Sequence, residues 1–170
     1  MLEIDQIAPP VVIKKTLTFD LKEFYRHMKS ALKDHGYYVR ERSYDEDVTA
    51  DGSRKTAFLW EADKKASEYV KTMITVDFVA VTKNVVVKED DKERKAQRGQ
   101  VTMKFLAFTK KQPESEWELH PKRPYGAFFR EIYEKFTKGN RAAAISSGLE
   151  DDLAKIIDEA KLFLKMRRYD

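Results

Sequence analysis

The sequence predicts a single α+β domain, built on a strongly twisted, mainly antiparallel sheet of about six strands that amphipathic helices cover on one face. Three observations favour this class. Apolar residues make up 42% and aromatic residues 12% of the 170 residues, enough for a substantial core. Several segments alternate apolar and polar residues with a period of two, as half-buried strands do. Three others carry apolar residues three and four apart, as amphipathic helices do.

The chain begins with an expected short arm, residues 1–10, and continues as one domain, residues 11–170. Pro9 and Pro10 mark the boundary between them, because proline lacks the amide hydrogen that the interior of a strand or helix uses. Alternating apolar residues in the arm allow it either to pair with a sheet edge or to fray. Residues 11–19, rich in Val, Ile and Thr, form the first strand of the predicted domain.

A helix is predicted from Asp20 to His35. Asp20 and Glu23 have the spacing of a capping box, in which the first side chain accepts from a free amide and the second reaches back. Gly36 supplies the left-handed residue that commonly ends a helix. The apolar stripe of this helix consists of Leu21, Phe24, Tyr25, Met28, Ala31 and Leu32.

A run of strands follows, predicted over 37–43, 55–63, 69–82, from 85 onward, and 100–109. Acidic residues at 45–47 together with Asp51-Gly52 indicate one turn, and Asn84 indicates another. The charged segment 88–98, with five bases and four acids, is expected to be an exposed hairpin tip. Short turns imply antiparallel pairing, because parallel strands need a long crossover.

Two helices are predicted to close the chain. The first follows Pro121 and Pro124 and ends at Gly139, because proline is favourable at the start of a helix and glycine at its end. A connector leads to Gly148, and the second helix carries apolar residues from 149 to 164. The element order β-α-β-β-β-β-β-α-α resembles that of helix-grip ligand-binding folds. The sequence contains no family motif, so no family is assigned.

Composition excludes several functional classes. The chain has no cysteine, which excludes disulfide scaffolds, thiolate zinc sites, iron–sulfur clusters and cysteine nucleophiles. No segment approaches the ~18 consecutive apolar residues of a membrane span. The first residues lack the basic and apolar regions of a signal peptide. The sequence therefore predicts a soluble cytoplasmic protein without a membrane span.

No catalytic residue, metal or cofactor is predicted. The three histidines, His27, His35 and His120, do not have the spacing of a metal site. The acidic residues near 45–51 fail the EF-hand pattern, and phosphate-binding or nucleophile-elbow motifs are missing. An enzyme is the least favoured class, although active sites assemble in space and can leave no motif in the sequence.

Aromatic side chains are the richest feature of the sequence and indicate a pocket. Apolar pockets with a few polar groups are typical small-ligand sites. We therefore predict a non-catalytic binding module that holds an apolar ligand or a protein partner in a groove between a curved sheet and helices. A plain, self-filled core explains the same side chains more simply. The predicted ligand-binding residues are Trp60, Phe78, Phe105, Phe129 and Tyr133.

The alternative function is that of a basic accessory protein of nucleic acid or of a ribonucleoprotein particle. Residues 1–85 contain 14 bases and 14 acids, whereas residues 86–170 contain 19 and 15, so the net charge of +4 lies entirely in the second half. The predicted contacts to phosphates or to an acidic partner are Lys161, Lys165, Arg167 and Arg168. The same residues would also serve as solubilising charge. Separately, an exposed sheet edge or the arm could support a homo-oligomer.

Overall fold

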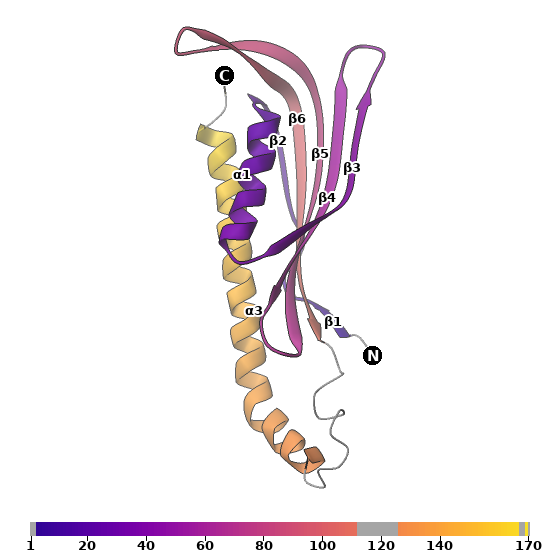
Figure 1. The fold of residues 1–170 in the computed structure, drawn as a ribbon, viewed down its shortest axis with the longest axis vertical. Helices are drawn as coiled ribbons and strands as arrows, with labels where there is room; N and C mark the ends of the chain where they lie inside the picture. Colours follow the sequence, from indigo (N-terminus) through magenta and orange to yellow (C-terminus); the bar gives the residue numbers. More distant parts are fainter. Residues whose placement is uncertain (1–2, 112–125, 167–168, 170) are drawn as a thin grey trace.

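A computed structural model shows a six-stranded antiparallel sheet with helices packed on one face, which confirms the predicted fold class (Figure 1). It describes residues 3–111, 126–166 and 169, and for 3, 126–142 and 166 the backbone alone. The strands are β1 (Glu3–Gln6), β2 (Val11–Phe19), β3 (Tyr38–Val48), β4 (Arg54–Lys65), β5 (Val70–Glu89) and β6 (Lys92–Lys111). The described helices are α1 (Leu21–Asp34) and α3 (Gly126–Met166).

The strand order is β1-β6-β5-β4-β3, and β2 also pairs with β6. β1 and β2 lie end to end along the same side of β6, because Gln6 is opposite Phe108 and Val11 is opposite Phe105. Together they form one interrupted edge strand, and the two prolines lie at the interruption. Of the two possibilities for the arm, the structure therefore supports pairing with the sheet edge.

The first helix begins and ends as its sequence predicts. Asp20 is its N-cap, and one carboxylate oxygen of Asp20 accepts from the backbone amide of Glu23 at 3.1 Å. Gly36 follows with a φ of 87°, a left-handed conformation that favours glycine. The helix buries Phe24, Met28 and Leu32 against the sheet.

The core lies between the inner face of the sheet and the two helices α1 and α3. Phe24 of α1 is its centre, and its ring centroid lies 5.9, 5.8 and 5.3 Å from those of Phe19, Phe78 and Phe163. The last of these rings belongs to α3, which therefore packs beside α1. A hydrogen bond between His27 and Glu159, at 3.0 Å, joins the same two helices at their surface.

The predicted turn at Asn84 is wrong. β5 continues through Asn84 and Val85 as far as Glu89, and the chain reverses at Asp90 and Asp91. Both aspartates have positive φ, 51° and 63°, as a two-residue hairpin turn requires. Asn84 lies within the strand pairing, opposite Gln97. A single asparagine does not force a turn when the segments on both sides of it can pair as strands.

The predicted turn over the acidic residues is shorter than expected. Residues 45–47 belong to β3, and the reversal is confined to Thr49–Ser53, where Gly52 has a φ of 86°. Cross-strand partners explain the difference, because Asp45 and Asp47 lie opposite Ala57 and Lys55 of β4. Exposed strand positions tolerate acidic side chains when such a partner ladder is available.

The two predicted closing helices are one continuous helix, α3, of 41 residues. Gly139 does not end it, because a glycine inside a helix costs only about 1 kcal/mol relative to alanine. The following Ala142–Ala144 favours helix and compensates for part of this cost. Pro121 and Pro124 lie outside the described residues. No helix in the described part of the chain is both long and apolar enough to cross a bilayer.

Candidate binding groove

An open groove of about 610 Å³ lies between the first turns of α1 and the inner face of β3 and β4. The lining residues are Leu21, Lys22, Tyr25 and Arg26 of α1, Glu41, Tyr44 and Glu46 of β3, Arg54, Thr56 and Phe58 of β4, and Gln97 of β6.

The pairing of β3 with β4 places the strand residues of the groove. Tyr44 lies opposite Phe58, and Glu46 lies opposite Thr56. These pairs continue the inward-facing row of Trp60, because alternate residues of a strand point to the same face. The register shifts between Glu41 and Ser43. A bulge of this kind changes the parity of a strand, which is why residues 41 and 44, three apart, both line the groove.

The helix contributes a second face to the groove. Leu21, Lys22, Tyr25 and Arg26 are spaced one, four and five residues apart, so they share one side of α1. Phe24 lies on the adjacent side and is buried in the core. The same two turns of helix therefore close the core on one side and border the groove on the other.

Three aromatic rings form the wall of the groove. The ring centroid of Tyr25 lies 5.2 Å from that of Phe58 and 6.2 Å from that of Tyr44, both in edge-to-face geometry. Beneath them, Phe58 packs on Trp60 and on Phe78 with centroids 4.5 Å apart in each case. The wall is thus continuous with the core, which holds the exposed rings in fixed orientations.

Each tyrosine of the wall is tied to a carboxylate. The Tyr25 hydroxyl donates to Glu41 at 2.5 Å, and the indole nitrogen of Trp60 donates to the same oxygen at 3.3 Å. The Tyr44 hydroxyl donates to Glu46 at 2.7 Å. Partial burial, followed by the nearby carboxylate, raises the pKa of Tyr25 and of Tyr44 to about 12. Both hydroxyls therefore stay protonated near neutral pH.

The cations of the groove lack comparable partners. Within the described residues, no ion pair or hydrogen bond joins the side chain of Lys22, Arg26 or Arg54 to another group. Other bases nearby are paired: Arg42 with Glu61 at 2.8 Å, for example. The groove therefore holds three unpaired positive charges beside two carboxylates that already accept hydrogen bonds.

One buried hydroxyl of the lining is also without a partner. Thr56 is 1% exposed, and its hydroxyl oxygen has no hydrogen-bond partner among the described residues. Thr82, one row along the same face of the sheet, has the same property. Leaving a buried hydroxyl unsatisfied costs roughly 1–3 kcal/mol. Thr56 thus carries an unused donor and acceptor at the wall of the groove.

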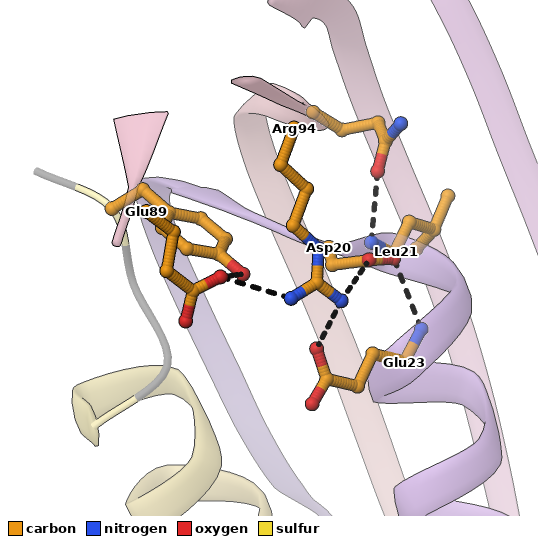
Figure 2. Close-up of polar contacts among 7 residues, drawn as sticks. Asp20, Leu21, Glu23, Glu89 and Arg94 are labelled. Atoms are coloured by element: carbon orange, nitrogen blue, oxygen red, sulfur yellow. Dashed lines mark hydrogen bonds and ion pairs between the residues drawn. The ribbon is translucent and has the colours of Figure 1, made fainter. Parts of the chain in front are cut away.

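The end of the groove near the start of α1 is held by a network centred on Arg94 (Figure 2). Its guanidinium reaches Glu89 at 2.9 Å, Asp20 at 3.2 Å and Glu23 at 3.3 Å. The Tyr169 hydroxyl donates to Glu89 at 3.2 Å, and the backbone amide of Tyr169 donates to the carbonyl oxygen of Thr18. The network joins the β5–β6 hairpin, the N-terminus of α1 and Tyr169.

Gly99 lets the hairpin reach that position. It lies opposite Thr82, and a β-carbon at Gly99 would stand 1.9 Å from the carbonyl oxygen of Val81. A side chain therefore does not fit at this position between β5 and β6. The two strands curve over the helices at their hairpin end (Figure 1). Beyond the bend, Gln97 accepts from the backbone amide of Leu21 at 2.8 Å, which joins β6 to the first turn of α1.

The predicted ligand-binding aromatics lie in the core rather than along this groove. Trp60, Phe78 and Phe105 are each 0% exposed. The side chains of Phe129 and Tyr133 lie outside the described part of the structure. Of the predicted basic contacts, Lys161 and Lys165 are exposed on the last turns of α3, whereas Arg167 and Arg168 are also outside the described residues.

Most of the groove residues were missed by the sequence reasoning. The sequence places Tyr25 in the apolar stripe of the helix, and the helical spacing alone does not distinguish a core residue from one at a groove. One signal was available in the strand that contains Phe58 and Trp60. Extending its inward-facing row backwards reaches Thr56 and then Arg54, so the inner face becomes polar towards that end. The bulge that brings in Glu41 leaves no such signal.

No group of three or more metal-ligating side chains occurs in the described part of the chain.

Comparisons with known proteins do not assign a function. No protein-family model matches the chain, and no curated protein does. An uncharacterised protein from Rhizobium leguminosarum is 10% identical, with 97% of this chain and 98% of that one covered and a TM-score of 0.25. A protein from Thermus thermophilus is 13% identical, with coverages of 86% and 98% and a TM-score of 0.19. Likenesses this weak carry no argument.

Proposed function

We propose that this protein is a non-catalytic binding module that holds a small, largely apolar molecule in the groove, in the cytoplasm. The observation that carries the proposal is a groove of about 610 Å³ walled by Tyr25, Tyr44 and Phe58. Small-molecule sites usually occupy roughly 300–1,000 Å³ and combine aromatic walls with a few polar groups. A protein partner would need about 800 Å² of contact on each side, so a small ligand is the better match.

The chemistry of the lining supports binding rather than catalysis. The described lining residues include no histidine, cysteine or serine, and the two carboxylates that could act as bases, Glu41 and Glu46, already accept hydrogen bonds from Tyr25 and Tyr44. The two tyrosines are poor proton donors and acceptors there, because the pKa of each is raised to about 12. Their hydrogen bonds to Glu41 and Glu46 hold the rings in place instead.

A fluorescence titration with phenylnaphthylamine tests the proposal, because this neutral apolar dye becomes more fluorescent when it moves from water into an apolar site. The wild-type protein is expected to bind it saturably. Tyr44→Ala removes one ring of the wall and should weaken binding about fivefold to tenfold. This loss corresponds to the free energy of one aromatic contact and of the apolar area that it buries. Tyr38→Ala is the matched control, since Tyr38 is an exposed tyrosine of the same strand outside the lining. Absence of saturable binding, or equal losses in both variants, would refute the proposal.

The alternative function, a basic accessory protein of nucleic acid, is favoured by the exposure of Lys161 and Lys165 at the end of α3. Its test is binding to a nucleic acid duplex at about 50 and about 200 mM salt. Phosphate contacts predict a marked loss of affinity between the two. Binding that is absent at the lower concentration, or the same at both, rejects this alternative.

A further inference from the structure

The polar side chains that line the groove favour one sign of ligand charge over the other. Lys22, Arg26 and Arg54 have no partner among the described residues. A cation that lines a concave site without a counterion favours an anionic ligand, because the ligand replaces lost hydration with a charge-assisted hydrogen bond. Arg54 is the most enclosed of the three, since it is half-buried whereas the other two are exposed.

The two carboxylates of the groove do not cancel this preference. Glu41 accepts from both Tyr25 and Trp60 through one oxygen. Glu46 accepts from Tyr44. Both carboxylates keep their negative charge, but these hydrogen bonds from neutral donors orient them towards the protein. The lining has three cations (Lys22, Arg26 and Arg54) against two carboxylates, so its net charge favours an anion.

Thr56 points to the same conclusion independently. Its hydroxyl is buried in the wall and has no partner among the described residues. A hydroxyl can donate to an anionic oxygen, and such hydrogen bonds are roughly twice as strong as those between neutral groups. The unused hydroxyl and the unpaired Arg54 come from β4, two residues apart on one face of the strand.

We propose that the groove takes a small amphipathic anion, whose apolar body lies on the aromatic wall and whose single carboxylate or sulfonate head is held by Arg54 and Thr56. This inference rests on the proposed function and adds the class of the ligand. A cationic ligand would have the aromatic rings in its favour, but it would face three unpaired positive charges. In addition, the ammonium of Lys29 already lies over the Tyr25 ring, at 5.6 Å from its centroid.

A matched pair of dyes separates the two proposals. Anilinonaphthalene sulfonate has the aromatic skeleton of phenylnaphthylamine and adds one sulfonate. The wild-type protein is expected to bind the sulfonate about tenfold more tightly or better, as one charge-assisted hydrogen bond predicts. Equal affinities would overturn the anion proposal and leave the proposed function intact. Failure of both dyes to bind would overturn both.

Charge variants locate the head group. Arg54→Gln should remove most of the preference for the sulfonate while the affinity for the neutral dye stays within about twofold. Lys104→Gln is the matched control, because Lys104 is an exposed base on the opposite face of the sheet. If Lys104→Gln lowers the preference as much as Arg54→Gln does, the anion is attracted by net charge alone and the proposed site is wrong.

Thr56→Val distinguishes a binding role from a structural one. The change removes a hydroxyl that satisfies nothing in the fold, so the denaturation midpoint should stay the same or rise. Affinity for the sulfonate should nevertheless fall, by about threefold to tenfold. A fall in stability, or unchanged affinity in a folded variant, would contradict the assignment of Thr56 to the ligand.

Displacement of the bound sulfonate dye identifies the ligand chemistry. Dodecanoate should displace it, dodecanol should do so more weakly, and acetate should not, because both the head and the apolar body are needed. Dodecyltrimethylammonium carries the same chain with a positive head. If it displaces the dye more strongly than dodecanoate does, the groove prefers cations and the proposal fails.

Discussion

Phe24 and Tyr25 are neighbours in the sequence, but they border two different regions of the molecule. Phe24 is 1% exposed and contacts rings from β2, β5 and α3, so that side of α1 is closed by apolar packing. Tyr25 is half-buried and stands at the groove, with its hydroxyl tied to Glu41. The closed side is filled by the protein itself, whereas the open side presents rings and cations, with the buried and unpartnered hydroxyl of Thr56 behind them.

The difference shows how a small domain can keep a site open without losing its core. On the closed side α3 supplies Phe163 to complete the packing around Phe24. On the open side a groove lies between α1 and the strands β3 and β4, and carboxylates rather than further apolar neighbours orient the tyrosines. Phe58 belongs to the wall and stacks on Phe78 of the core, so the wall is packed directly against the core.

The largest expected effect separates the two sides directly. Phe24→Ala should lower the free energy of unfolding by about 3–5 kcal/mol, because it opens a cavity among three other rings. Tyr25→Ala should cost about 1–2 kcal/mol, since its ring is only half-buried. Urea denaturation of both variants measures the contrast. Equal losses would mean that the groove wall is part of the core and that the two sides are not distinct.

An intermediate effect is expected where the sheet bends towards the groove. Gly99→Ala places a β-carbon against the Val81 carbonyl, so the strands must separate or the bend must relax. The expected loss is about 1–3 kcal/mol, the usual range for overpacking. Hydrogen exchange should rise at the β5–β6 hairpin and the first turn of α1, which Arg94 and Gln97 connect. Faster exchange confined to the core would contradict this account.

The smallest effect concerns the tyrosine–carboxylate bonds of the open side. The pKa of Tyr25 and of Tyr44 is raised from 10.0 to about 12 in the fold. The neutral hydroxyl is therefore favoured in the folded state, and its stabilising contribution is complete below pH 10 and is lost as the pH rises to 12. Tyr25→Phe and Tyr44→Phe should each cost less than about 1 kcal/mol, because both side chains lie at an open groove where solvent screens the interaction.

Urea denaturation at several pH values checks this sign. The stability difference between the wild-type protein and each phenylalanine variant should be constant below pH 10 and should decrease from there towards pH 12. Tyr38→Phe is the control, since Tyr38 is an exposed tyrosine on the same strand. A difference that stays constant through that range would mean that neither the partial burial nor the carboxylates Glu41 and Glu46 raise the pKa of these tyrosines.

Local patterns in the sequence predicted much of this fold. The N-cap at Asp20, the helix stop at Gly36 and the period-two row of Phe58, Trp60 and Ala62 all depend on near neighbours, and the structure contains each of them. The predictions that failed also concerned local signals. Asn84 and Gly139 favour a turn or a helix end by themselves, but strand pairing and helix propagation outweighed them.

The sequence by itself determined the fold class, the faces of its main elements and the excess of positive charge in its second half. The tertiary structure decided where a groove lies and what lines it. Lys22, Arg26 and Arg54 acquire a common role only when α1 stands opposite β4. Their neighbour Glu41 enters through a bulge. Such a site depends on register and curvature between segments far apart in the chain, and no local pattern of residues encodes these.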